Sequence, residues 1–127
     1  MDSGKVSLNQ FKIVNTLNGN LITSNVTSNN TQVQTNLVTP IAHNLGYVPS
    51  FLAYVQLSPT SYCLMPYTTT DIFGSTINNY AVRSYSVTAN ATSIFVTLQV
   101  TQTTTTNTTV GYGGESVKVY ILQETAK

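Results

Sequence analysis

The stretch that decides the fold is SIFVTLQVTQ, residues 93–102. Apolar side chains occupy every second position from Ile94 to Val100, and the positions between them hold Phe95 and neutral polar residues. Because side chains alternate between the two faces of a β-strand, this pattern predicts a strand with one face buried in a core. A second run, residues 80–88, precedes it across residues 89–92, and the two together predict a β-hairpin.

Two other segments show the same alternation. In residues 50–57, Phe51, Ala53, Val55 and Leu57 share one face, and in residues 116–124 Val117, Val119 and Ile121 do. Weaker strands are predicted from Val33 to the residue before Pro40 and over residues 62–67. No segment has the 3.6-residue period of a helix. We therefore predict an all-β fold, an antiparallel β-sandwich or jelly-roll-like barrel of seven to eight short strands.

The first 32 residues are predicted to form an N-terminal arm or hairpin. Asn18-Gly19 lies between Leu17 and Leu21, and this dipeptide is preferred in the type I′ turn of a hairpin. The predicted hairpin pairs residues 6–16 with residues 20–27 and has a bulge near Asn9 and Gln10, where the alternation slips. We expect residues 1–32 to dock on a partner or to swap between copies, and residues 33–127 to form the sandwich domain.

The composition excludes several classes of function. Only 7% of the residues are charged, against a typical share of about 25%, and the formal net charge is +1. Polarity comes instead from 22 Thr, 13 Asn, 12 Ser and 7 Gln. Five scattered basic residues make no positive patch for nucleic acid, and no apolar run approaches the roughly 20 residues of a membrane span. We expect neither a nucleic acid nor a membrane as partner.

Chemistry-bearing residues are few. His43 and the single cysteine, Cys63, are the side chains that titrate near neutrality, and nothing in their spacing suggests a nucleophile and its base. The carboxylates are scattered along the chain, at Asp2, Asp71, Glu115 and Glu124. We therefore predict that the protein is not an enzyme and holds no metal or other cofactor.

Residues 68–79 show no periodicity and are predicted to form a long loop. Long loops in compact domains commonly carry function, so this segment is a candidate binding surface for a ligand or receptor. Tyrosine rings suit the apolar faces of sugars, and asparagine offers paired donors and acceptors. The surface is predicted to comprise Tyr62, Tyr67, Asp71, Asn78, Asn79 and Tyr80.

A turn is predicted just before the strand at residues 50–57. Gly46 would supply a positive φ angle, Pro49 would fix the entry into the strand, and Tyr47 lies between them. We interpret His43 as hydrogen-bonded to the backbone of its own turn. The alternative is that it binds a ligand, or a metal on a symmetry axis where several copies meet.

The run from His43 to Pro49, His-Asn-Leu-Gly-Tyr-Val-Pro, resembles the His-x-Leu-Gly-Tyr-x-Pro segment of small β-structured virion proteins of tailed bacteriophages. The order of strands over about residues 33–124 also resembles the carboxy-terminal β-sandwich domains of phage tail fibres and the H-type lectin fold. The resemblance implies a virion structural protein, a capsid-decoration, head-fibre or tail-associated component. Its partners would be other virion proteins and copies of itself, with a trimer favoured. The alternative that it implies is a carbohydrate- or host-receptor-binding module that recognises a host-surface glycan.

Overall fold

The computed structural model describes residues 11–73 and 78–124. This part of the chain is all-β, and in it no helix is long and apolar enough to cross a membrane. The described strands are β1 (Phe11–Asn20), β2 (Ser24–Ser28), β3 (Thr31–Ala42), β4 (Ser50–Ser58), β5 (Ser61–Leu64), β6 (Tyr67–Ile72), β7 (Tyr80–Ala89), β8 (Ser93–Thr104), β9 (Thr108–Tyr112) and β10 (Ser116–Glu124).

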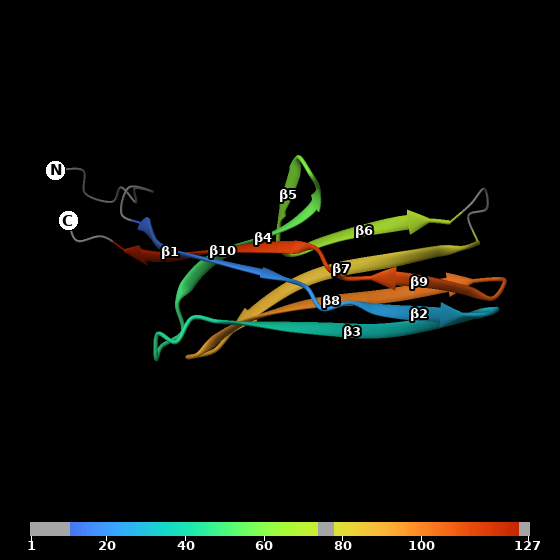
Figure 1. The fold of residues 1–127 in the computed structure, drawn as a ribbon, viewed down its shortest axis with the longest axis horizontal. Coiled ribbons are helices and arrows are strands. Elements are labelled where there is room, and N and C mark those ends of the chain that lie inside the picture. The colour runs from blue at the N-terminus through green and yellow to red at the C-terminus, as the bar shows by residue number, and fades with distance from the viewer. Residues whose placement is uncertain (1–10, 74–77, 125–127) are drawn as a thin grey trace, which may run out of the picture.

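The strands form three antiparallel sheets in a sandwich. One layer is the sheet β3-β8-β7-β6, and the other consists of the sheet β1-β10-β4-β5 and the two-stranded sheet β2-β9. Figure 1 shows β1 and β10 in the half of the molecule nearer the two termini, and β2 and β9 in the other half. We call the first half the terminal half and the second the distal half.

The four-stranded sheet β1-β10-β4-β5 and the two-stranded sheet β2-β9 are joined by continuous chain. β1 leads into β2 and β9 leads into β10, so one pair of strands is interrupted halfway along its length. Two backbone hydrogen bonds bridge the interruption, from Leu21 N–H to the Glu115 carbonyl and from Gly114 N–H to the Leu21 carbonyl, both 2.9 Å. Gly113 has a φ of +93°, and a Cβ added there would lie 1.9 Å from the Ile22 carbonyl oxygen. Only glycine fits at this crossing.

The core lies between the inner faces of the layers, and the three strands on which the fold prediction depended are confirmed. Val55 in β4, Val119 in β10 and the residues of β8 from Ile94 to Val100 that face inward have no exposed surface. The hairpin of β7 and β8 is also confirmed, since Ala89 pairs with Ile94 and Tyr80 with Thr103. The alternation of apolar and polar residues in the sequence was enough to identify these strands, because each strand has one apolar face.

The predicted hairpin around Asn18-Gly19 is wrong. Asn18 and Gly19 lie inside β1 and face Lys118 and Val117 of β10, so the chain continues straight where a turn was predicted. Pairing with β10 buries Leu21 and half-buries Leu17, which outweighs the local preference of Asn-Gly for a turn. The predicted bulge near residues 9 and 10 lies outside the described residues, although the pairing of β1 does shift register between Ile13 and Asn15.

The described part of the chain has ten strands, where seven to eight were predicted. The additional ones are β6 and β9, which are rich in threonine and have at most two apolar residues in alternation, so their sequences resemble loops. β3 also continues past Pro40 to Ala42, because β3 is an edge strand and the missing N–H of Pro40 leaves no ladder bond unmade. β1 and β2, placed in a separate arm by the sequence analysis, pair with β10 and β9 of the same chain.

Candidate functional site

The residues of the predicted binding surface do not come together. Residues 68–72 were predicted to be part of a loop but belong to the strand β6. Tyr67 and Asp71 lie on the inner face of β6, toward the other layer. Tyr80 lies at the start of β7 and faces outward with its partner Thr103. Tyr62 is on β5, in the opposite layer.

The two asparagines lie where β6 and β7 connect. Asn78 is exposed, and the side-chain oxygen of Asn79 accepts hydrogen bonds from the backbone N–H (2.7 Å) and the hydroxyl (3.1 Å) of Thr105. Asn79 therefore ties the β6–β7 connection to the β8–β9 connection. Of the six predicted residues, Tyr62 is the one that lines a hollow together with other tyrosines.

That hollow lies on the outer face of the sheet β1-β10-β4-β5. Its volume is about 240 Å³, and it is lined by Tyr54 of β4, Tyr62 of β5, and Lys118 and Tyr120 of β10. We call these four residues the tyrosine hollow. The rings of Tyr54 and Tyr120 meet edge to face with their centroids 5.8 Å apart, and Lys118 Nζ lies 5.3 Å from the centroid of the Tyr62 ring.

Strand register places these side chains on one face. Tyr54 is directly opposite Lys118, and Tyr120 is opposite Leu52. The residues between them along each strand, Ala53 and Val119, point into the core. This site was not predicted from the sequence. The signal that could have indicated it is the occurrence of Tyr54, Lys118 and Tyr120 at positions that alternate with the apolar residues of two strands.

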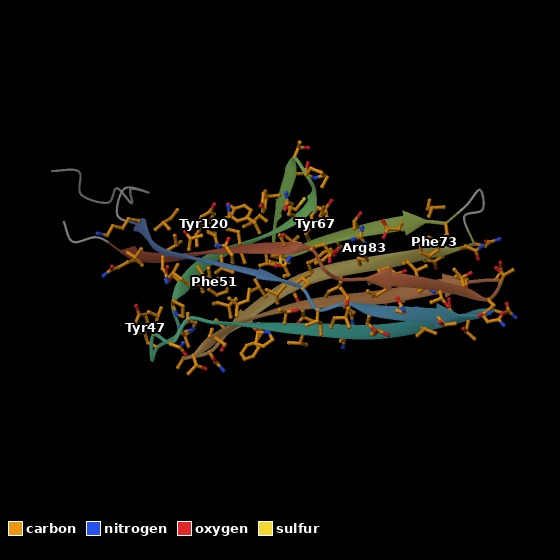
Figure 2. All side chains as sticks on the ribbon, in the orientation of Figure 1. Tyr47, Phe51, Tyr67, Phe73, Arg83 and Tyr120 are labelled. Atoms are coloured by element: carbon orange, nitrogen blue, oxygen red, sulfur yellow. The ribbon has the colours of Figure 1, made fainter. Side chains whose placement is uncertain are left out.

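Asp71 joins a different cluster, inside the sandwich. Its carboxylate accepts two hydrogen bonds from the Arg83 guanidinium, Nε to Oδ2 at 2.6 Å and Nη2 to Oδ1 at 3.1 Å. Arg83 Nη1 also reaches Glu115 Oε2 at 3.4 Å and donates to the Tyr85 hydroxyl at 2.5 Å, and that hydroxyl donates to Glu115. Figure 2 shows Arg83 in the middle of the molecule. The cluster joins β6, β7 and the segment that precedes β10.

Burial and the contacts within this cluster shift the pKa values of Arg83, Tyr85 and the nearby Tyr112. Burial acts to lower the pKa of Arg83, but the hydrogen bonds that Arg83 donates to Asp71 and the neighbouring negative charges outweigh it, so the net shift of the pKa is upward. Burial and the hydrogen bond to Glu115 raise the pKa of Tyr85. Burial, followed by the charge of Asp71, raises the pKa of Tyr112 to about 12. Each shift favours the state present at neutral pH, with a charged arginine and neutral tyrosines.

A cavity of about 400 Å³ borders this cluster, lined by Asp71, Phe73, Arg83, Val110, Gly111, Tyr112, Gly113 and Glu115. Both carboxylates on its wall are already paired with Arg83. The arrangement holds strands together through charge-assisted hydrogen bonds. In the described ranges no three residues among His, Cys, Asp and Glu are grouped so that they could hold a metal ion.

The predicted turn carries a buried histidine. Nδ1 of His43 accepts a hydrogen bond from the Leu45 N–H at 3.0 Å, and Nε2 donates to the Asn90 carbonyl at 2.8 Å. Gly46 has a φ of +80°, and Pro49 is buried at the entry to β4. Between them Tyr47 and Val48 are 58% and 62% exposed. Figure 2 shows Tyr47 at the opposite end of the molecule from Phe73.

The chain was also compared with known proteins. No family model matches it, and neither a curated protein nor a solved structure matches it.

Proposed function

We propose that this protein is a structural component of a bacteriophage virion, which acts by assembling with copies of itself and docking on the particle. The proposal follows from the resemblance of residues 43–49 to a segment of small virion proteins. One observation of the structure supports it most: that segment is a rigidly held turn that presents two large apolar side chains to solvent. We call residues 43–49 the docking turn.

Backbone hydrogen bonds fix the docking turn to the connection between β7 and β8. The N–H groups of His43 and Asn44 both donate to the Thr92 carbonyl, at 2.8 and 3.0 Å, and Gly46 N–H donates to the Ala91 carbonyl at 2.9 Å. With the two bonds of the His43 ring, these contacts hold the turn in one conformation. A preformed surface loses little conformational entropy when it binds.

Further copies of this chain suit the docking turn as partners. Val48 is the most exposed large apolar residue in the described part of the chain, and Tyr47 is almost as exposed. Burying such side chains is favourable, and tyrosine is enriched at the centres of interfaces. No charged residue occurs from Ile41 to Ser50, so identical turns can meet around a symmetry axis without like-charge repulsion.

The solution mass of the full chain tests the proposal. We expect a trimer, three times the 13.7 kDa of one chain, at micromolar concentration by light scattering or sedimentation. The double variant Tyr47→Ser, Val48→Ser should sediment as a monomer. The matched control is Ile72→Ser, because Ile72 is 59% exposed but lies on β6 in the distal half, and it should remain trimeric.

A monomeric wild-type chain, or a double variant with unchanged mass, would contradict assembly through this turn. The virion role is tested separately: mass spectrometry of purified particles that carry this gene should detect the protein as a stoichiometric component.

Binding of a host-surface saccharide is the second candidate function. It is favoured by the tyrosine hollow, which lies away from the docking turn on the outer face of a sheet.

A further inference from the structure

We infer that the tyrosine hollow binds a saccharide that carries a carboxylate, such as a uronate. The inference deepens the second candidate function by naming the site and the class of ligand. It does not depend on assembly through the docking turn. Three features support the inference: the tyrosine rings that line the hollow, the charge of Lys118, and the amide side chains on strand positions next to the hollow.

The aromatic walls suit the faces of a sugar ring. A pyranose presents patches of C–H groups that pack on aromatic rings, while its hydroxyls bind to the polar edges. Tyr54 and Tyr120 stand edge to face, so their rings offer surfaces in two orientations, and Tyr62 forms the opposite wall with 47% of its surface exposed. A volume of about 240 Å³ is at the small end for a ligand site and suits one sugar ring of a longer chain.

The positive charge of Lys118 favours a ligand with a negative charge. Among the described side chains the ion pairs are those of Arg83 with Asp71 and Glu115, so none of these carboxylates neutralises Lys118. Its ammonium group is held over the Tyr62 ring by a cation–π contact, which orients it at the hollow. A positive charge held beside aromatic rings, with no anionic partner among the described side chains, is complementary to a carboxylate on the bound sugar.

Neutral hydrogen-bonding groups are the cross-strand neighbours of two residues that line the hollow. Asn18 of β1 lies opposite Lys118, and Gln56 of β4 lies opposite Tyr62. Gln56 uses its amide nitrogen to donate to the Pro59 carbonyl at 3.3 Å, which leaves its side-chain oxygen as an acceptor. Amides next to aromatic rings are the groups that recognise sugar hydroxyls, because they provide donors and acceptors together.

Titration of the full-length protein with trigalacturonate, followed by NMR chemical shifts or calorimetry, tests the inference. We expect saturable binding of trigalacturonate and at least threefold weaker binding of galactotriose, its neutral counterpart. Lys118→Gln should weaken trigalacturonate binding about three- to tenfold, as for one partly exposed ion pair, and should weaken galactotriose binding by a smaller factor, because only the charged sugar loses an ion pair. Tyr62→Ala removes an exposed ring and should weaken binding of both sugars.

The matched control is Lys12→Gln, an exposed lysine of β1 in the same sheet that does not line the hollow; this variant should bind as wild type does. Absence of saturable binding, equal affinity for the two sugars, or an equal loss in Lys12→Gln and Lys118→Gln would each overturn the inference. Failure of the docking proposal is distinguishable, since it appears in the solution mass and not in the titration.

Discussion

The inner face of β8 meets two different environments along its length. In the terminal half its inward side chains are Ile94, Val96 and Leu98, which pack beneath the sheet β1-β10-β4-β5. In the distal half they are Gln102 and Thr104, which are just as buried but lie beneath β2 and β9. One strand thus passes from an apolar core into a hydrogen-bonded one without leaving the interior.

The polar half is organised around Gln102. Its amide nitrogen donates to the carbonyls of Val26 and Thr108, both at 3.2 Å, and to the Ser28 hydroxyl at 2.9 Å. Its side-chain oxygen accepts from the Tyr112 hydroxyl at 2.6 Å. Apolar contacts are non-directional, whereas these bonds have fixed geometry. The comparison indicates that the terminal half supplies stability through packing, while the distal half fixes where the short β2-β9 sheet sits.

The largest effect is expected in the apolar half. Leu98→Ala removes a side chain with no exposed surface from the centre of the core and leaves a cavity, so the free energy of unfolding should fall by about 2–5 kcal/mol in denaturant titration. Thr97→Ala, the neighbouring position on the outer face of β8, is the control and should change stability by less than about 1 kcal/mol. Equal losses at the two positions would show that the inner face does not carry the stability of this half.

A smaller, more local effect is expected in the polar half. Gln102→Leu keeps the volume but removes the hydrogen bonds from Gln102 to its partner groups in β2 and β9, which should lower the free energy of unfolding by about 1–3 kcal/mol. Amide hydrogen exchange should rise selectively in β2 and β9, because those strands lose their anchor to β8. Gln99→Leu, on the outer face of β8, serves as the control. Uniformly faster exchange over all strands would contradict an anchoring role.

The same difference explains which parts of the fold could be predicted from the sequence. β4, β8 and β10 were identified because apolar residues mark their inner faces. β6 and β9 belong to the polar half. The inward positions of β6 after Tyr67 hold Thr69 and Asp71, and those of β9 hold Thr108, Val110 and Tyr112, so neither strand has more than two apolar residues in alternation to mark it. The Asn18-Gly19 turn failed for a related reason: the pairing partner of β1 is β10, about 100 residues away in the chain, and a local motif does not contain that information.

The candidate site was predicted less well than the fold. Tyr62 was correctly placed at the surface, but its neighbours in the hollow come from β4 and β10, which become adjacent only through sheet order. Alternation indicates which face of a strand a residue occupies and not which strand lies beside it. The turn at residues 43–49 was easier to predict, because His43, Gly46 and Pro49 are close together in the sequence. Its hydrogen bonds to residues 90–92 were not predicted, because those residues are distant in the sequence.

The smallest effect concerns Tyr112 at the end of β9, whose hydroxyl donates a hydrogen bond to Gln102. Its pKa is raised from an ordinary value of 10.0 to about 12, so its contribution to stability is complete below about pH 10 and is lost as the pH rises toward 12. In this window the folded state retains a proton that the unfolded state releases, at a cost of up to about 1.4 kcal/mol per pH unit. Tyr112→Phe should be about 1 kcal/mol less stable than wild type at pH 8, since the bond to Gln102 is lost, but its stability should fall less steeply above pH 10. Urea titrations at pH 8, 10 and 11 measure the gap between the two proteins, and a gap that stays constant would mean that the Tyr112 hydroxyl does not titrate differently in the folded and unfolded chains.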